Sequence, residues 1–188
     1  MIAIATEQGF VLLEALGNNW IGSTLVERGK VEEGVARIRL SLDAYAAADP
    51  KMEAKFERFR LAHAHRKTGR PEEGLAELYK IRALAAKRGR HALDSYSFQL
   101  EGELLLMVDA SKNADAERCF RSAIKAAGAQ AAKAVELVAT THLARLLNQT
   151  DRREEARAML AEIYHWFTEG FDTLDLKDAK ALLEELSR

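Results

Sequence analysis

A phrase that opens helices returns four times along the chain at nearly even spacing. In each copy a turn is followed by acidic residues and then by a small residue, which serves as a register mark. The marks are Gly34, Gly74, Ala116 and Ala156, which are 40, 42 and 40 residues apart. A period in this range is typical of helical-repeat proteins, in which each hairpin buries its apolar side by stacking on its neighbours. The sequence therefore predicts stacked helical hairpins, a class that normally offers a binding surface and carries no chemistry.

A second small residue precedes each mark. Gly22, Ala62 and Ala144 lie twelve residues before their marks, whereas Gly102 lies fourteen before its own. The loop 109–113 of the third repeat is therefore expected to be two residues longer. Small residues at these places let paired helices approach closely, and large apolar residues fill the remaining volume. The expected core residues are Ile21, Leu25, Ile38, Leu61, Leu78, Leu105, Cys119, Phe120, Leu143, Leu147, Leu160 and Ile163.

The predicted fold is all-α: a right-handed superhelical array of about four hairpins with a C-terminal capping helix. Helices are expected at 10–28, 31–47, 51–68, 72–88, 92–108, 114–127, 131–148, 152–168 and 174–187. No stretch rich in Ser, Gly or Pro is long enough to be a linker, so residues 1–188 are expected to form one domain. Its parts are the end of a preceding helix (1–9), repeats at 10–47, 51–88, 92–127 and 131–168, and the capping helix (174–187).

Charge and cysteine content limit the expected partners and the compartment. The formal net charge is −1 with both signs well mixed, which argues against general affinity for nucleic acid or an anionic membrane. The densest basic run, 87–91, is interpreted as a solvated turn between two helices. Cys119 is the only cysteine, which suits a reducing cytoplasm, and no apolar run is long enough to span a membrane. We therefore expect a cytoplasmic protein with no nucleic-acid or membrane partner.

Motifs for catalysis or metal binding fail on spacing. A phosphate-binding loop needs Ser or Thr after its Gly-Lys pair, but Gly29 and Lys30 are followed by Val31. His63 and His65 are two residues apart, so on a helix they point in directions roughly 200° apart and cannot chelate one ion. We therefore expect a protein that is not an enzyme and holds no cofactor or metal.

A family resemblance rests on the third repeat and the C-terminal run. Ala116, Phe120 and Ala123, with Gly102 upstream, resemble the tetratricopeptide repeat (TPR) signature. Residues 160–186, together with the Leu-Glu-Gly-Glu-Leu-Leu-Leu run at 100–106, resemble the last repeat of bacterial adenylate/guanylate cyclase-like and predicted-ATPase signalling proteins. The resemblance implies the regulatory or sensor repeats of such a protein, without its cyclase or ATPase activity. Residues 1–9 then suggest either a fragment or a free-standing relic whose first helix is a cap.

The binding surface is expected on the first helix of each hairpin, which lines the concave side of such arrays. Positions one residue after the small mark, and four before or after that, should project inward. A groove rich in amide, hydroxyl and charged groups suits a polar peptide or an acidic chain end, and an ordinary solvated surface is the alternative. The predicted protein- or peptide-binding residues are Asn19, Ser23, Phe59, His63, Arg66, Lys67, Gln99, Glu103, Thr141, Arg145 and Asn148.

Both ends of the array carry apolar side chains that need cover. Trp166, Phe167 and Phe171 are expected to anchor the last helix, with a docking site for another domain as the alternative. Deleting that helix should lower thermal stability. At the other end Ile2, Ile4, Phe10 and Leu13 should be exposed, so the alternative function is structural self-association as a homodimer.

Overall fold

The computed structural model describes residues 2–48, 54–88 and 94–188, and within them the chain forms ten α-helices and no strand. This confirms the all-α prediction. Residues 1–9, predicted to be the end of a preceding helix, contain a short separate helix. The start of the third predicted helix, at 51–53, lies outside the described residues. The helices are α1 (Ile2–Glu7), α2 (Val11–Glu27), α3 (Val31–Ala48), α4 (Lys55–Lys67), α5 (Pro71–Arg88), α6 (Asp94–Val108), α7 (Asn113–Ala129), α8 (Lys133–Gln149), α9 (Arg153–Tyr164) and α10 (Leu174–Leu186).

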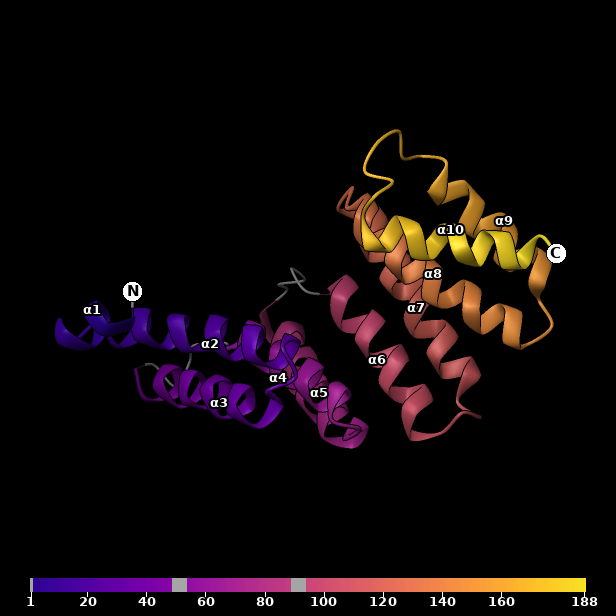
Figure 1. Cartoon of the computed structure of the whole chain (residues 1–188). Helices are drawn as coiled ribbons and strands as arrows, with labels where there is room; N and C mark the ends of the chain where they lie inside the picture. The colour runs from indigo at the N-terminus through magenta and orange to yellow at the C-terminus, as the bar shows by residue number, and fades with distance from the viewer. Residues whose placement is uncertain (1, 49–53, 89–93) are drawn as a thin grey trace. The chain divides into compact units, whose positions relative to one another are not determined.

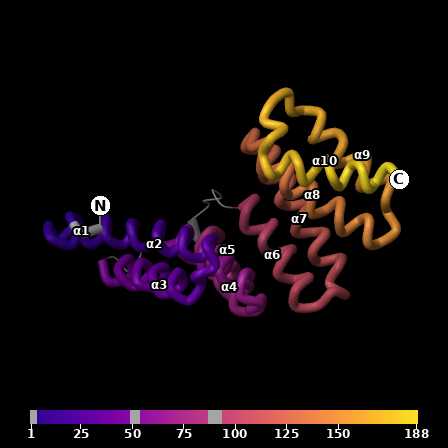
Figure 2. The backbone as a smooth tube through the Cα atoms, in the orientation of Figure 1, coloured from indigo at the N-terminus to yellow at the C-terminus, as the bar shows by residue number. Residues whose placement is uncertain are grey.

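The helices pair into hairpins within two compact units, Met1–His91 and Ala92–Arg188 (Figure 1). In the first unit α1 packs on α2, α2 pairs with α3, and α4 pairs with α5. In the second unit α6 pairs with α7, α8 pairs with α9, and α10 lies against both α8 and α9 (Figure 2). The four predicted hairpins and the helix that follows them are therefore present, while the assignment of the whole chain to one domain stays a prediction.

The close pairing of α2 with α3 depends on two glycines at predicted register positions. A Cβ atom on Gly22 would lie 2.7 Å from the carbonyl oxygen of Gly34, and one on Gly34 would lie 2.6 Å from that of Gly22. Such distances are too short for real atoms, so only glycine permits this approach. In the second unit a Cβ on Gly102 would lie 2.7 Å from the Phe120 ring, so this glycine makes room for a side chain. The other small register residues are also buried: Ala62, Gly74, Ala116, Ala144 and Ala156.

The turn inside a hairpin has a repeated backbone geometry. Gly29 and Gly69 adopt the left-handed conformation, with φ of 82° and 68°, and end α2 and α4. In the first turn the amide of Lys30 donates to the carbonyl oxygen of Leu25 at 2.9 Å, which satisfies a carbonyl at the helix end. Asp151 takes the same place in the fourth hairpin with φ of 59°. Asp tolerates this conformation better than most residues, so the turn of the fourth hairpin keeps the same backbone shape without a glycine.

The core of the second unit joins α7, α8, α9 and α10. Phe167 packs at its edge as expected, but Trp166 is 58% exposed and Phe171 is 46% exposed. The prediction that Trp166 anchors the last helix is therefore wrong. The reason is that α9 ends at Tyr164, four residues before the predicted end, and the following turn leaves Trp166 on the surface, edge-on to Phe167. The helix α10 is held instead by its own apolar side, namely Leu176, Ala179, Leu182 and Leu186.

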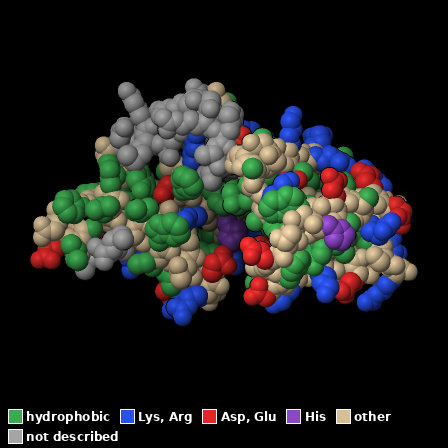
Figure 3. Space-filling view, turned by 90° about the horizontal axis from the view of Figure 1, so that it is seen from above, with side chains coloured by type: hydrophobic (Ala, Val, Ile, Leu, Met, Phe, Trp, Pro, Cys, Tyr) green, Lys and Arg blue, Asp and Glu red, His purple; other side chains and the backbone are tan. Residues whose placement is uncertain are grey.

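The first unit has an apolar core and, in addition, apolar side chains on its surface. Val26, Ile38, Leu61 and Ala64 pack together between α2, α3 and α4. Ile21, which the sequence places in the core, is 42% exposed because it lies off the buried side of α2. Figure 3 shows hydrophobic side chains gathered over the α1–α2 end of this unit. Those that are exposed are Ile4, Phe10, Val11, Leu12, Leu13, Leu16, Trp20 and Ile21.

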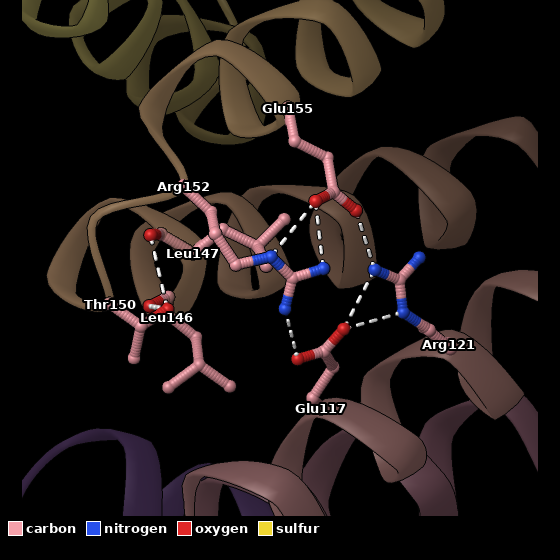
Figure 4. A network of polar contacts seen from close by, with 7 residues as sticks. All are labelled: Glu117, Arg121, Leu146, Leu147, Thr150, Arg152 and Glu155. Atoms are coloured by element: carbon pink, nitrogen blue, oxygen red, sulfur yellow. Dashed lines mark hydrogen bonds and ion pairs between the residues drawn. The ribbon is translucent and has the colours of Figure 1, made fainter.

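A network of four charged side chains joins the second helices of the last two hairpins (Figure 4). Arg121 on α7 bridges Glu117 and Glu155, at 2.7 Å to each carboxylate. Arg152, just before α9, reaches the same two carboxylates, also at 2.7 Å. Burial alone would raise the pKa of Glu117, but the hydrogen bonds from Arg152 and Arg121 outweigh it and lower that pKa. Opposite charges thus alternate around a ring, and the network helps to hold one hairpin against the next.

Candidate functional site

The first helices of the first two hairpins, α2 and α4, lie side by side and run parallel. Asn19 donates from Nδ2 to Oε1 of Glu57 at 2.8 Å, and Lys67 donates from Nζ to Oε2 of Glu27 at 2.6 Å. Because the later residue of α2 meets the later residue of α4, the two helices point the same way. Their C-terminal halves bring together four of the predicted binding residues.

Three of them, His63, Arg66 and Lys67, lie around the carboxylate of Glu27. Besides its bond from Lys67, Glu27 has its Oε1 3.6 Å from Nδ1 of His63. Nη2 of Arg66 lies 3.2 Å from Nε2 of the same ring. An arginine only donates, so Nε2 accepts and the neutral ring carries its proton on Nδ1, the nitrogen that faces Glu27. The hydrogen bond from Lys67 is the largest effect on Glu27 and lowers its pKa, so the carboxylate is charged at neutral pH.

Two residues outside the predicted set complete the site. The guanidinium carbon of Arg60 lies 4.0 Å from the ring centre of Trp20, a cation–π contact. Arg60 also donates from Nη1 to Oγ of Ser23 at 2.8 Å. Trp20 itself is 58% exposed. Beside this stack is a pocket of 270 Å³ lined by Trp20, Ser23, Val26, Glu27, Arg60 and His63.

The sequence contained a signal for both missed residues. Trp20 precedes Ser23 by three positions and Arg60 precedes His63 by three, and residues three apart share one side of a helix. Adding the residue three positions before each register position includes them. Steps of four from the small residues pass over these two positions.

The electrostatics of the site are dominated by cations. Arg60, Arg66 and Lys67 carry three positive charges, and Glu27 offsets one of them. Burial lowers the pKa of Arg60, but a guanidinium stays charged at any physiological pH. An aromatic ring, a guanidinium and an ammonium on one surface can donate hydrogen bonds to carboxylates and carbonyls while covering apolar groups.

Asn19 does not lie on an open surface. Asn19 is 2% exposed, because its side chain fills the space between α2 and α4 and donates to Glu57, which is itself buried. Burial raises the pKa of Glu57, and burial also raises that of Tyr45, with the charge of Glu57 as a further cause. Phe59 is half-buried. Asn19 therefore joins the two helices, and the prediction that it lines an accessible groove is corrected.

The predicted residues of the second unit mostly contact one another or neighbouring helices. Gln99 donates to Glu103 at 3.1 Å, and Glu103 lies 3.4 Å from Nε2 of His142 on α8. Thr141 is 3% exposed and donates to the carbonyl oxygen of Leu137 at 2.8 Å. Its hydroxyl is thus used within its own helix, and Thr141 is not available to a partner.

The last two predicted residues are occupied by the chain's own final helix. Arg145 donates to Asp178, and Asn148 donates to Glu185 at 3.1 Å, so both bind carboxylates of α10. α10 lies on α8 as the first helix of a further hairpin would, which leaves these positions inside a helix–helix contact. The register selects residues that contact the first helix of the following hairpin. It does not distinguish that contact from contact with a partner.

Elsewhere in the described chain, no group of three or more His, Cys, Asp or Glu side chains is placed to hold a metal ion. His65 is buried with Nδ1 2.9 Å from Glu73, on a different side of α4 from His63, and burial lowers its pKa. Cys119 is half-buried, less deeply than predicted. The basic run 87–91 lies outside the described side chains. No helix among the described residues combines the length and apolar composition that a membrane crossing requires.

Comparison with known proteins identifies the fold. No protein-family model and no curated protein matches the chain. Two solved structures that resemble it are a candidate kinesin light chain of Podosopora anserina with nearly identical TPR-like repeats and a single-residue variant of that protein. Their TM-scores are 0.69 and 0.70, each with 16% identity over 90% of this chain and 83% of the other. Neither links the chain to cyclases or ATPases. At this identity the likeness concerns the fold alone, and the chain has the TPR-like helical-repeat fold that its spacing predicts.

Proposed function

We propose that this chain is a non-catalytic scaffold that binds a protein or peptide through the first unit. The surface in question, the α2–α4 surface, consists of Trp20, Ser23, Glu27, Arg60, His63 and Lys67. The observation that carries the proposal is the exposed Trp20 ring, fixed by Arg60 beside a pocket. A TPR-like fold supports this function as an analogy, because such repeats commonly bind other chains.

The residue types of this surface favour a protein partner. Trp and Arg are enriched among the residues that dominate binding energy at interfaces, especially where a pocket adjoins them. Here the ring is already ordered, because Arg60 stacks on it and is itself held by Ser23. A side chain ordered before binding loses less conformational entropy when the partner arrives. The excess positive charge favours a polar peptide or an acidic chain end.

Selection from a random peptide library displayed on phage tests this function. Peptides enriched on the full chain are synthesised, and their affinity is measured for the wild type and for Trp20→Ala. We expect Trp20→Ala to weaken binding at least tenfold, about 1.4 kcal/mol. Arg60→Lys keeps the charge but loses the planar stack, and we expect an intermediate loss.

The chain offers a matched control outside the site. On α5, Arg82 lies 5.9 Å from the ring of Tyr79, which is 48% exposed, so this pair has similar chemistry at another place. Tyr79→Ala should leave peptide affinity unchanged within about twofold. Failure to enrich any peptide, or equal losses in Trp20→Ala and Tyr79→Ala, would overturn the α2–α4 surface as the binding site.

We further propose that the chain is the regulatory or sensor region of a larger bacterial signalling protein in the cytoplasm. The support is the resemblance of residues 160–186 and 100–106 to the last repeat of cyclase-like and predicted-ATPase proteins. The genomic reading frame upstream of Met1 tests this context. Codons for a cyclase or an ATPase domain in frame are the expected result, and a frame without either domain would contradict it.

A second candidate function is self-association as a homodimer. It is favoured by one specific observation, the exposed apolar side chains of α1 and α2. Light scattering of the chain over a concentration series tests it, with a constant monomer mass as the contrary result.

A further inference from the structure

The exposed apolar side chains of α2 include a continuous seam. Leu12, Leu16 and Trp20 follow one another at four-residue spacing, which places them in a row along one side of the helix, and Leu13 lies beside the row. Their exposed fractions are 41% for Leu12, 37% for Leu16, 58% for Trp20 and 48% for Leu13. Between Phe10 and Val26 the only charged residue is Glu14, so this side of α2 has almost no charge to oppose contact with another apolar surface.

The apolar surface around this seam is large for a unit of this size. If a large apolar side chain has roughly 200 Å² of surface, the eight exposed side chains of α1 and α2 present on the order of 800 Å². A standard stable interface covers about 800 Å² on each partner, and soluble monomers rarely expose apolar patches this large. Leu12, Leu13, Leu16 and Trp20 together supply about half of that area, and the other four exposed side chains supply the rest.

We propose that the seam binds the seam of a second copy of this chain across a two-fold axis. A two-fold axis perpendicular to α2 makes the two helices antiparallel and pairs each residue with its reciprocal. Leu16 lies midway between Leu12 and Trp20, so it meets its own equivalent at the axis. Trp20 then meets the equivalent of Leu12. Every large side chain of the seam thus has an apolar partner, and Arg60 stays stacked on the Trp20 ring.

This pairing regulates the α2–α4 surface, because Trp20 belongs both to the seam and to the pocket beside Arg60. A second copy that covers Trp20 excludes a peptide from the same ring. The dimer is therefore the closed form of the binding site and the monomer is the open form. This regulatory step rests on the proposed peptide-binding function, whereas the pairing of the two copies does not.

Sedimentation velocity and tryptophan fluorescence test the pairing without any ligand. All proteins carry Trp166→Phe, so that Trp20 is the only tryptophan, and are measured from about 1 µM to about 1 mM. We expect the protein to pass from monomer to dimer within this range. Over the same range the Trp20 emission should shift to the blue, and its quenching by acrylamide should fall.

Matched leucine variants locate the contact. Leu16→Asp should weaken dimerisation at least tenfold and keep Trp20 open to acrylamide at all concentrations. Leu12→Asp, a second seam variant, should do the same if Leu16→Asp fails to fold by circular dichroism. Leu40→Asp introduces the same charge at a leucine of α3 that is 56% exposed, and should behave as the wild type.

Three results would overturn the inference. A monomer at every concentration eliminates the pairing. A dimer that both seam variants leave intact, or that Leu40→Asp weakens equally, places the contact elsewhere. A dimer in which Trp20 stays fully open to acrylamide eliminates the regulatory step. Because these measurements contain no peptide, failure of the library selection leaves them unchanged, and the two proposals fail separately.

Discussion

The helices α2 and α10 each pack on neighbouring helices through one side, but their outer sides differ. α10 turns Leu176, Leu182 and other apolar residues inward and presents charged residues such as Lys180 and Glu184 to solvent. α2 packs inward through small and polar residues, among them Gly22 and Asn19, and presents Leu16 and Trp20 to solvent. An amphipathic helix completes a stack, whereas a helix that is apolar on its outer side needs something to cover it.

The difference also concerns what holds each helix in place. Helix α10 is held by the burial of its leucines, so replacing one of them should lower the free energy of unfolding substantially. α2 is held by close backbone approach to α3 and by a buried polar contact to α4, and its large apolar residues contribute little where they are exposed. Apolar content is thus a poor guide to which residues of a helix stabilise the fold.

A pair of leucine truncations should give the largest effect. Leu182→Ala removes a side chain that is 5% exposed in the core of the second unit, and should lower the free energy of unfolding by about 2–5 kcal/mol. Leu12→Ala, at 41% exposure on α2, should change it by about 0.5 kcal/mol or less. Urea unfolding at protein concentrations where the chain is monomeric measures both. Equal losses would mean that the outer side of α2 is covered within the monomer.

Adding one methyl group to the α2–α3 contact should cost somewhat less. Gly22→Ala places a Cβ 2.7 Å from a backbone oxygen that cannot rotate away, so the helices must separate, and we expect a loss of about 1–3 kcal/mol. Gly128→Ala on α7 is the control, because no atom lies within 4 Å of its added Cβ. That change should stabilise by about 0.5–1 kcal/mol through helix propensity. A harmless Gly22→Ala would show that close approach does not hold α2.

The buried polar contact between α2 and α4 should make stability depend on pH. Burial raises the pKa of Glu57 in the folded protein, so the stability that its protonated form contributes is lost as pH rises through the folded pKa. Glu57→Gln keeps an oxygen that accepts from Asn19 and cannot ionise. We therefore expect a higher melting temperature than the wild type at pH 7, with the advantage shrinking toward about pH 4.3, the ordinary value for Glu. The exposed Glu72→Gln is the control, and an unchanged difference across this range would contradict the prediction.

The smallest effect is expected where α10 meets α8 through charge. Arg145 and Asp178 are 39% and 53% exposed, so their ion pair should contribute less than about 1 kcal/mol. A double-mutant cycle with Arg145→Ala and Asp178→Ala measures the coupling, which should fall further in 1 M salt. A coupling of several kcal/mol would show that α10 is held by charge as much as by its leucines.

Much of the fold was predictable, because it depends on short-range rules. The spacing of Gly34, Gly74, Ala116 and Ala156 fixed the pairing of helices, since small residues can repeat in a stack only where two backbones meet. Helix ends were predictable where a glycine such as Gly29 ends the helix. The end of α9 was not, because its last turn is followed by Trp166, Phe167 and Thr168, none of which breaks a helix by itself.

The candidate site was predictable only in part. Periodicity correctly brought Ser23, His63 and Lys67 to one surface, because they follow the turn of their helices. It failed for Arg145 and Thr141, since a helix register gives the direction of a side chain and says nothing of what lies there. It also missed Trp20, because steps of four from the small residues pass over the position three residues before Ser23.

The third hairpin loop, residues 109–112, is one residue longer than the other three, not two as predicted, and this has a consequence for how the chain tolerates change. The turns at Gly29, Gly69 and Asp151 are each closed by a left-handed residue, which fixes their length. Loop 109–112 is closed differently, by the amide of Ser111 donating to Oδ1 of Asp109 at 2.8 Å. An aspartate turn of this kind uses only local atoms and leaves the next helix to begin on its own. Among the described hairpin turns this is accordingly the place where inserted residues, including a reporter domain, should be accommodated without shifting either helix.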